Sequence, residues 1–381
     1  MIPYGQQWIS DDDIQEVERV LRSDWITTGP TVPVFEESLT HATGCRHAVC
    51  VNSGTSALDI AVQSLNAPAG SEVITTPLTF VATANACLYH GLVPVFADID
   101  RETRNIDPRE IRRRITEKTR AIIAVDFAGH PCEWDEIRRL ADDHGLALID
   151  DACHALGAEY RGRRLGTLAD LTILSFHPVK HVTTGEGGAV LTEDPQRADL
   201  LRMLRSHGID RNALARSGPG AGWAYDMTVL GRNYRMTDFQ AALGISQLTR
   251  LDRFLSRRRE IADRYTRAFL DLSHVEVPVT RPHVRHAWHI YTVLMKGIPR
   301  DTAFSALRRM GIGANVHYLP VYRFSYYRER FAISPAGYPV SEDVCARTLT
   351  LPLFPRMSDA DVDTVISAVN SLPAETAAKE S

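Results

Sequence analysis

Short runs of consecutive apolar residues alternate with helical patterns along residues 40–191 of this chain. Runs that are apolar at every position indicate strands covered on both faces, whereas half-exposed strands alternate apolar and polar residues. Strands that are separated by helices indicate βαβ units and a mostly parallel sheet. We therefore predict an α/β fold with helices on both faces of a central sheet, whose strands lie at 47–51, 72–75, 93–96, 121–125, 146–149, 171–174 and 188–191.

The length of the chain, 381 residues, suits two domains. The pattern of residues 236–264 predicts one long helical region that connects them. Beyond it we expect a strand at 290–295, a helix at 301–310, a strand through 315–318 and a last helix near 359–372. The expected division is a large, ligand-binding domain with an N-terminal arm at 1–250 and a smaller α+β C-terminal domain at 251–381.

Composition excludes several classes of function. Hydrophobic residues make up 44% of the chain, charged residues 24%, and the net charge is −4, so neither a nucleic acid nor a membrane is expected as a partner. The six cysteines form no CxxC pair and no ligand-spaced cluster, so no metal site is expected. The start MIPYGQQWISDDD lacks the pattern of a signal peptide, and no apolar run approaches the ~20 residues of a membrane span. We expect a cytoplasmic protein with reduced thiols.

A mostly parallel sheet binds ligands at the carboxyl ends of its strands, and two polar side chains follow predicted strands at these ends. Lys180 comes shortly after the run 171–174, and Asp151 closely follows the run 146–149. A lysine that can form a Schiff base and a carboxylate that keeps a pyridine nitrogen protonated are what a pyridoxal 5′-phosphate (PLP) site requires. We predict PLP as the cofactor and Lys180 and Asp151 as catalytic residues, with a surface lysine as the alternative. Asp150 completes the strand, so we expect Asp151 and not Asp150 to face the cofactor.

A phosphate site is predicted where SGTS opens a helix directly after the strand 47–51. The small residues Ser53, Gly54 and Thr55 let backbone N–H groups approach an anion, and the helix N-terminus adds partial positive charge. A simple helix cap is the alternative interpretation. Ser175, at the end of the run 171–174, is expected to donate to the phosphate or to the phenolic oxygen of PLP.

Four further residues are weaker candidates, each with a structural alternative. Phe80 can stack on the pyridine ring or belong to the core. His154 can lie against the ring or be a structural histidine. Asn233 and Arg235 can contact phosphate or substrate, across a dimer interface in one interpretation, or simply mark a helix entry.

These motifs together resemble the DegT/DnrJ/EryC1/StrS sugar aminotransferases, which are fold-type I PLP enzymes. The resemblance covers almost the whole chain and rests on SGTSAL, TTPLTFVATANA, IDDACHALGAEYRGRRLG, SFHPVKHVTTGEGG and GRNYRMTDFQAALGISQL. Within the family, SFHPVKHVTTGEGG and the opening IPYG…LRSDWITTGP are most similar to the PseC-like branch of the pseudaminic acid pathway. One departure is visible, since the family usually has Glu-Asp where this chain has Asp150-Asp151.

The resemblance implies roles for residues at matching positions. Lys180 would be the Schiff-base lysine and proton shuttle, Asp151 the partner of the pyridinium nitrogen, and Phe80 the stacking ring. Asn233 would reach the phosphate of the neighbouring subunit's cofactor, which implies a homodimer with shared active sites. The residues that would line the sugar-nucleotide and donor pocket are Tyr4, Thr28, Arg235, His317 and Tyr318.

The implied reaction transfers an amino group from L-glutamate to C4 of a nucleotide-linked 4-keto-6-deoxy sugar, of the type of UDP-4-keto-6-deoxy-L-AltNAc, with pyridoxamine 5′-phosphate as intermediate. The alternative is another 3- or 4-keto sugar nucleotide, or a keto-cyclitol, of an antibiotic or surface-glycan pathway. A PLP-dependent sugar dehydratase is less favoured because Lys180 is present and the cysteines are not clustered. A non-catalytic PLP-binding regulator is disfavoured by the intact lysine and aspartate.

Overall fold

A seven-stranded sheet forms the centre of the larger part of the molecule, in the order β1-β9-β8-β5-β4-β2-β3. The computed structural model describes residues 1–210 and 225–372. Strands β8, β5, β4, β2 and β3 are parallel, and β9 runs antiparallel between β8 and β1. The strands are β1 (His47–Val51), β2 (Glu72–Thr75), β3 (Val93–Phe96), β4 (Thr119–Val125), β5 (Ala147–Asp151), β8 (Leu171–Ser175) and β9 (Gly188–Thr192).

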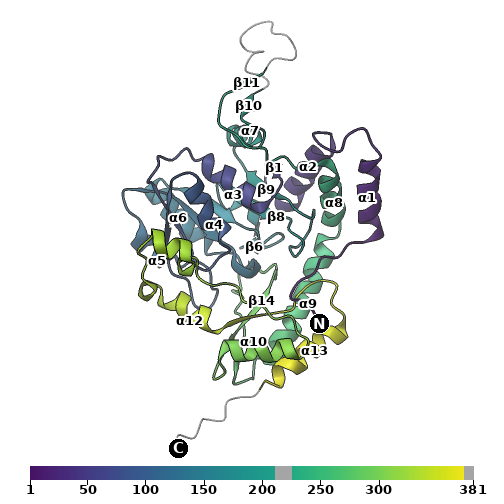
Figure 1. The fold of residues 1–381 in the computed structure, drawn as a ribbon, viewed down its shortest axis with the longest axis vertical. Coiled ribbons are helices and arrows are strands. Elements are labelled where there is room, and N and C mark those ends of the chain that lie inside the picture. The colour runs from purple at the N-terminus through teal and green to yellow at the C-terminus, as the bar shows by residue number, and fades with distance from the viewer. Residues whose placement is uncertain (211–224, 373–381) are drawn as a thin grey trace, which may run out of the picture.

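Helices cover both faces of this sheet, which explains why its strands are buried at nearly every position (Figure 1). One buried cluster joins the sheet to α3 (Gly54–Gln63), α4 (Ala82–Tyr89) and α7 (Pro195–Leu204). A second cluster joins the opposite face to α2 (Thr31–Thr43), α5 (Pro108–Arg114), α6 (Trp134–His144) and α8 (Asp238–Leu248). The predicted α/β architecture with a mostly parallel sheet is confirmed.

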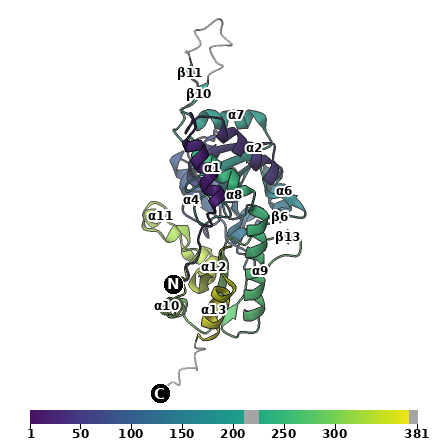
Figure 2. The ribbon, with the colours of Figure 1, turned by 90° about the vertical axis from the view of Figure 1, so that its right-hand side faces the viewer.

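A smaller sheet, in the order β12-β14-β15, lies at the other end of the molecule. It is antiparallel and consists of β12 (Val275–Glu276), β14 (Tyr291–Met295) and β15 (Thr348–Leu351). The long helix α9 (Leu251–Phe269) runs from the large sheet region alongside it (Figure 2). A separate buried cluster joins this sheet to α9, α10 (Arg300–Arg309) and α13 (Asp359–Asn370). The division at residue 250 stays a prediction.

The N-terminal segment crosses to this smaller sheet region. The backbone of Ile2 exchanges hydrogen bonds with Gly311 and Gly313, at 2.8 and 2.7 Å. The carbonyl of Tyr4 accepts from the N–H of Leu353 at 3.1 Å. These contacts hold the backbone of Tyr4 beside residues that are far from it in the sequence.

Two sequence predictions of secondary structure are wrong. The predicted single helix at 236–264 is two helices, because α8 ends at Leu248 and α9 begins at Leu251. At the break, the Thr249 hydroxyl donates to the carbonyl of Ser246, a local bond that competes with helical pairing. The predicted strand through 315–318 contains only an isolated bridge between Asn315 and Thr350, and the peptide bond that follows His317 is cis.

The remaining elements are short or peripheral. They are α1 (Asp11–Leu21), α11 (Ser325–Arg330), α12 (Pro339–Arg347), the pair β10 (Ile209–Asp210) and β11 (Asp226–Met227), and the sheet β13 (Val284–Arg285), β6 (Glu159–Tyr160) and β7 (Arg163–Arg164). Across the described residues, none of the helices has the length and apolar character needed to cross a membrane.

Candidate active site

Lys180 lies in a loop that both begins and ends at the sheet. The loop leaves β8 after Ser175 and returns as β9 at Gly188, and these two residues pair. Inside it, the N–H of Phe176 donates to the carbonyl of Gly187 at 2.9 Å, and the N–H of Lys180 donates to that of His177 at 2.9 Å. Because the strands are antiparallel neighbours, the lysine is held at the carboxyl end of β8.

Asp151, at the end of β5, faces the same space and is buried. Its Oδ2 accepts from the hydroxyl of Thr83 at 2.7 Å, and its Oδ1 accepts from the N–H of Cys153 at 3.3 Å. The hydroxyl of Thr79 lies 2.9 Å from that of Thr83. Since Thr83 has one hydroxyl proton, which goes to Asp151, Thr79 donates to Thr83. This chain of donors fixes the orientation of the Asp151 carboxyl group.

Asp150 does not face this space. It is fully buried, and neither of its carboxyl oxygens has a hydrogen-bond partner within the part of the chain that the structure describes. Burial raises its pKa well above the usual range. Asp126, also buried, follows the adjacent strand β4, and burial raises its pKa to about 7. After burial, the nearby carboxyls of Asp126 and Asp151 raise the pKa of Asp150 further.

The N-terminus of α3 forms a small cradle beside Ser175. Ser53 caps the helix by accepting from the N–H of Ser56, at 3.0 Å. The first helical N–H groups, at Gly54 and Thr55, have no partner within the helix. A Cβ on Gly54 would lie 2.9 Å from the Cβ of Ser175 and 3.2 Å from its Oγ, so only glycine leaves this cradle open.

A cavity of about 430 Å³ joins these groups. This volume lies within the range of pockets that hold cofactors and small ligands. Most of the predicted site residues line it, namely Tyr4, Ser53, Gly54, Thr55, Phe80, Asp151, His154, Ser175, Lys180, His317 and Tyr318.

Aromatic and imidazole rings close the cavity on the side of the smaller sheet. The hydroxyl of Tyr318 lies 3.2 Å from Nε2 of His154, and Nδ1 of His317 lies 2.8 Å from the hydroxyl of Thr350. The ring of Phe80 lies 6.5 Å from that of Tyr318, and Phe80 is 58% exposed. Phe80 therefore stands at the mouth of the cavity.

Burial shifts Lys180 and its histidine neighbours toward their uncharged forms. Burial lowers the pKa of Lys180, and Arg258 adds to this effect, whereas Cys153 and Asp151 oppose it. Burial also lowers the pKa of His317 to about 4 and that of His154 well below its usual range. A lysine with a lowered pKa is a better base and nucleophile at neutral pH.

Three predicted residues do not line this cavity. Thr28 is exposed between α1 and α2 and has φ = 56°. Asn233 is exposed, and its backbone forms an isolated bridge with Ser206. Arg235, two residues further on, is also outside the cavity of this chain.

The structure adds residues that the sequence did not single out. Thr83 contacts Asp151 directly, and His289 lines the cavity with its ring 4.4 Å from that of His154. Thr83 is in the first turn of α4 and Thr79 is in the bend that precedes this helix, so the two hydroxyls meet through the turn into the helix. No local signal marks His289, because it precedes β14 and approaches His154 only through the fold.

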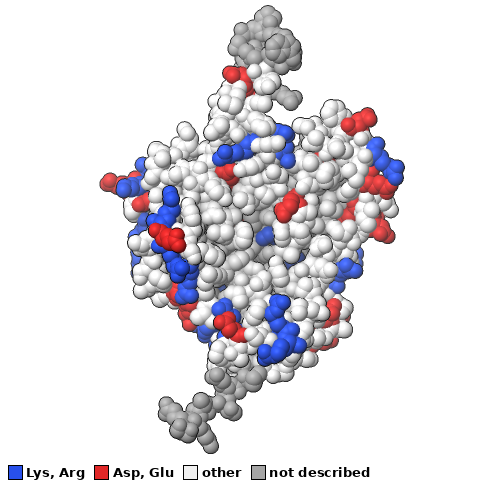
Figure 3. Space-filling model, in the orientation of Figure 1, with Lys and Arg blue, Asp and Glu red and all other residues white. Residues whose placement is uncertain are grey.

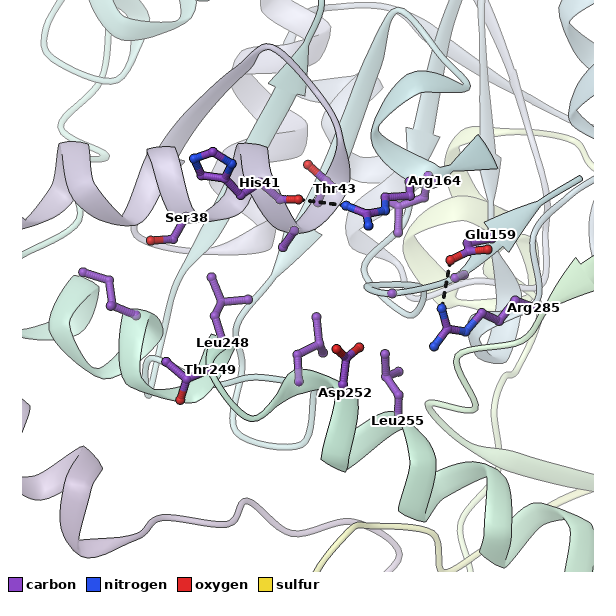
Figure 4. Close-up of a pocket in the computed structure, with 16 residues that line it drawn as sticks. Ser38, His41, Thr43, Glu159, Arg164, Leu248, Thr249, Asp252, Leu255 and Arg285 are labelled. Atoms are coloured by element: carbon purple, nitrogen blue, oxygen red, sulfur yellow. Dashed lines mark hydrogen bonds and ion pairs between the residues drawn. The ribbon is translucent and has the colours of Figure 1, made fainter. Parts of the chain in front are cut away.

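A second cavity, of about 500 Å³, lies between α2, α8, α9 and the β6–β7 hairpin (Figure 4). Its Arg285 is paired with Glu159 at 2.8 Å, and Arg164 donates to the carbonyl of His41 at 2.9 Å. It contains no lysine and none of the predicted site residues, so it is not the candidate active site.

The residues of the first cavity fit PLP. Lys180 and Asp151 supply the covalent and ring-nitrogen partners, and the Gly54 cradle supplies donors for a phosphate. Among the described residues, the buried Nδ1 of His154 has no hydrogen-bond partner, which leaves a polar atom for a ligand in the cavity. Within residues 1–210 and 225–372, no group of three or more His, Cys, Asp or Glu side chains could hold a metal ion.

The chain is similar to known proteins along almost its whole length. The model of the DegT/DnrJ/EryC1/StrS aminotransferase family matches residues 7–370. Spore coat polysaccharide biosynthesis protein SpsC of Bacillus subtilis is 41% identical over 376 residues, 97% of each chain.

Two solved structures have the same fold. PseC of Helicobacter pylori, an aminotransferase involved in the biosynthesis of pseudoaminic acid, has a TM-score of 0.91 and 32% identity over 97% of this chain and 98% of its own. The sugar aminotransferase Spr1654 of Streptococcus pneumoniae, in its PMP form, has a TM-score of 0.92 and 32% identity over the same shares. Spr1654 is also known in a PLP form.

These likenesses and the fit of the cavity confirm the predicted fold type, enzyme class and PLP cofactor. The chain belongs to the DegT/DnrJ/EryC1/StrS aminotransferase family.

Proposed function

We propose that this sugar aminotransferase transfers the amino group of L-glutamate to C4 of a nucleotide-linked 4-keto-6-deoxy sugar, of the type of UDP-4-keto-6-deoxy-L-AltNAc in a pseudaminic acid-type pathway. The observation that carries the transfer is the convergence of Lys180 and Asp151 on one cavity. The likeness to PseC of Helicobacter pylori supports the substrate class.

Bound PLP supplies the electron-accepting ring on which amino-group transfer depends. Asp151 is proposed to hold the proton of the ring nitrogen, with its own position fixed by Thr83 and Cys153. Lys180 is proposed to carry a proton between the amino-acid or sugar carbon and the cofactor, which its lowered pKa favours. Ser53, Gly54, Thr55 and Ser175 are proposed to hold the phosphate.

The cavity leaves room for substrates on the side of the smaller sheet. Tyr4, His317 and Tyr318 line this side, and we propose that they contact the donor and the sugar. His154 and Phe80 are proposed to flank the cofactor ring.

We propose that the active unit is a homodimer in which a second copy completes each site. Asn233 is exposed outside the cavity of its own chain, as expected for a residue that reaches a neighbour's cofactor. Thr28 and Arg235 are proposed to contribute in the same way. Large apolar side chains are exposed, among them Trp25, Ile26, Phe80, Tyr89 and Leu230. On the face that Figure 3 shows, charged residues lie mainly toward the margin and the middle is largely uncharged, as in interface cores.

A second candidate substrate is another 3- or 4-keto sugar nucleotide, or a keto-cyclitol, of a surface-glycan or antibiotic pathway. SpsC of Bacillus subtilis, a spore coat polysaccharide biosynthesis protein, is 41% identical to this chain, compared with 32% for PseC. We also propose that the reaction takes place in the cytoplasm, because all six cysteines are free thiols.

The testing experiment follows the visible spectrum of the purified protein with PLP as L-glutamate is added. We expect the band of the lysine-bound cofactor, at about 410–430 nm, to be replaced by that of the pyridoxamine form, at about 330 nm. The pyridoxamine form is then mixed with UDP- and dTDP-linked keto sugars, and return of the first band identifies the acceptor. No response to glutamate would refute the donor, and a response to 3-keto sugars alone would refute the C4 assignment.

A further inference from the structure

Arg258, on α9, is a buried cation without an acidic partner. It is 1% exposed, and among the ion pairs of the described residues none involves it. Burying a guanidinium costs free energy unless its donors are satisfied, so such a residue requires a structural reason. Burial lowers its pKa to about 9, which leaves it positively charged at neutral pH.

The donors of Arg258 bind backbone carbonyls from separate parts of the chain. Nη1 donates to the carbonyls of Trp288, His289 and Leu353, at 3.3, 2.9 and 3.1 Å. Nη2 lies 3.5 Å from the carbonyl of Val179, the residue before Lys180. One side chain therefore connects the lysine loop to the segments that flank the smaller sheet.

Charged and titratable groups surround Lys180 on several sides, and Arg258 is the one arginine among them. Three neighbouring side chains affect the pKa of Lys180: Cys153 and Asp151 raise it, and Arg258 lowers it. The other titratable groups that face the lysine or line its cavity are Tyr4, His154, His177, His181, Glu186, Arg258, His289, His317 and Tyr318. Arg258 is the fixed cation of this set.

We propose that Arg258 is a positioning residue for Lys180, which holds the lysine loop at Val179 and keeps a fixed positive charge behind the lysine amino group. Nearby positive charge disfavours a proton on the lysine nitrogen. Arg258 thus keeps this nitrogen ready to bind the cofactor and to accept a proton at neutral pH. This inference rests on the proposed role of Lys180.

The test is a pH titration of the visible band of the holoenzyme, whose midpoint reports protonation of the nitrogen that joins Lys180 to PLP. Arg258→Gln removes the charge and keeps a donor for the carbonyls. We expect its midpoint to rise by roughly half to one pH unit, because the protonated form loses a repulsive neighbour. Arg258→Lys keeps the charge but not the fork of donors, so its midpoint should stay near that of the wild type while kcat falls.

Arg257→Gln is the matched control, since Arg257 is one residue earlier on α9 and binds Asp359 and the carbonyl of Met357 instead. We expect the control to leave the midpoint unchanged. A folded Arg258→Gln variant with the wild-type midpoint would overturn the electrostatic role. If that variant does not fold, Arg258→Lys tests the proposal instead, and a wild-type kcat in Arg258→Lys would overturn the positioning role. A wild-type protein without the visible band would instead refute the proposed function of Lys180.

Discussion

Replacement of Thr83 by valine tests how strongly the activity depends on the hydrogen bonds that hold Asp151. Valine matches the shape of threonine but has no hydroxyl group. The change removes the 2.7 Å bond to Oδ2 and leaves Asp151 with the longer bond, 3.3 Å, from the N–H of Cys153. Because both partners are buried, water does not replace the lost donor freely.

The expected loss of activity in Thr83→Val follows from the charge on the acceptor, the Asp151 carboxylate. A hydrogen bond to a charged group contributes about 1.5–3 kcal/mol, roughly a tenfold to hundredfold effect on an equilibrium or a rate. We expect kcat for amino transfer to fall at least about tenfold in Thr83→Val, because the carboxylate is less well held against the ring nitrogen. Thr79→Val removes only the donor to Thr83 and should cost less, about threefold, since its bond joins two neutral groups.

The assay measures single-turnover conversion of the PLP form by L-glutamate in the wild type and the two variants, with PLP affinity measured in parallel. A graded series, in which Thr83→Val loses more than Thr79→Val, is the expected outcome. Equal rates in wild type and Thr83→Val, with both proteins saturated with PLP, would refute the idea that this chain of donors supports catalysis.

Four further predictions follow from the geometry. Lys180→Ala should bind PLP without the visible band of the lysine-bound cofactor and should transfer no amino group; measurable turnover would contradict its role. Asp151→Asn should lower kcat by at least about a hundredfold at unchanged thermal stability, because a neutral amide cannot pair with a charged ring nitrogen. Gly54→Ala should weaken PLP binding at least about tenfold, measured by equilibrium titration, because its Cβ would lie 2.9 Å from that of Ser175. Acidification from pH 7 to 5 should destabilise the protein in urea unfolding, because the buried histidines have folded pKa values below 6.5 and the unfolded state therefore binds more protons; each contributes up to about 1.4 kcal/mol per pH unit. The raised pKa values of two carboxyls, Asp126 and Asp150, act in the opposite direction. They are outnumbered by the histidines with lowered pKa values, which are His130, His154, His181, His286, His289 and His317. A free energy of unfolding that does not change between pH 7 and 5 would contradict this balance.

The sequence predicts the sheet and the meeting of Lys180 with Asp151 for a simple physical reason. Both residues follow apolar strands, and strands of a parallel sheet end at a common edge, so local patterns determine a distant contact. The opposite orientations of Asp150 and Asp151 follow in the same way from the alternation of side chains along a strand.

Other features depend on packing that no local pattern encodes. His289 and Arg258 approach the lysine loop only because the smaller sheet docks beside it. The apolar pattern continues across the helix break at Thr249 and so does not mark it. At this break the side chain of Arg250 pairs with Asp13 on α1. Residues 315–318 have strand-forming composition, yet His317 bonds to Thr350 through its side chain.

The reversed direction of β9 has a consequence for how this protein could change. The lysine loop is attached at both ends to neighbouring strands, and its internal bonds from Phe176 and Lys180 are made by backbone atoms. The shape of the loop is therefore independent of which side chain stands at position 180. A single substitution at position 180 would exchange the reactive group while the loop, the strands and the cavity stayed in place. New chemistry could therefore arise on this scaffold without a new fold.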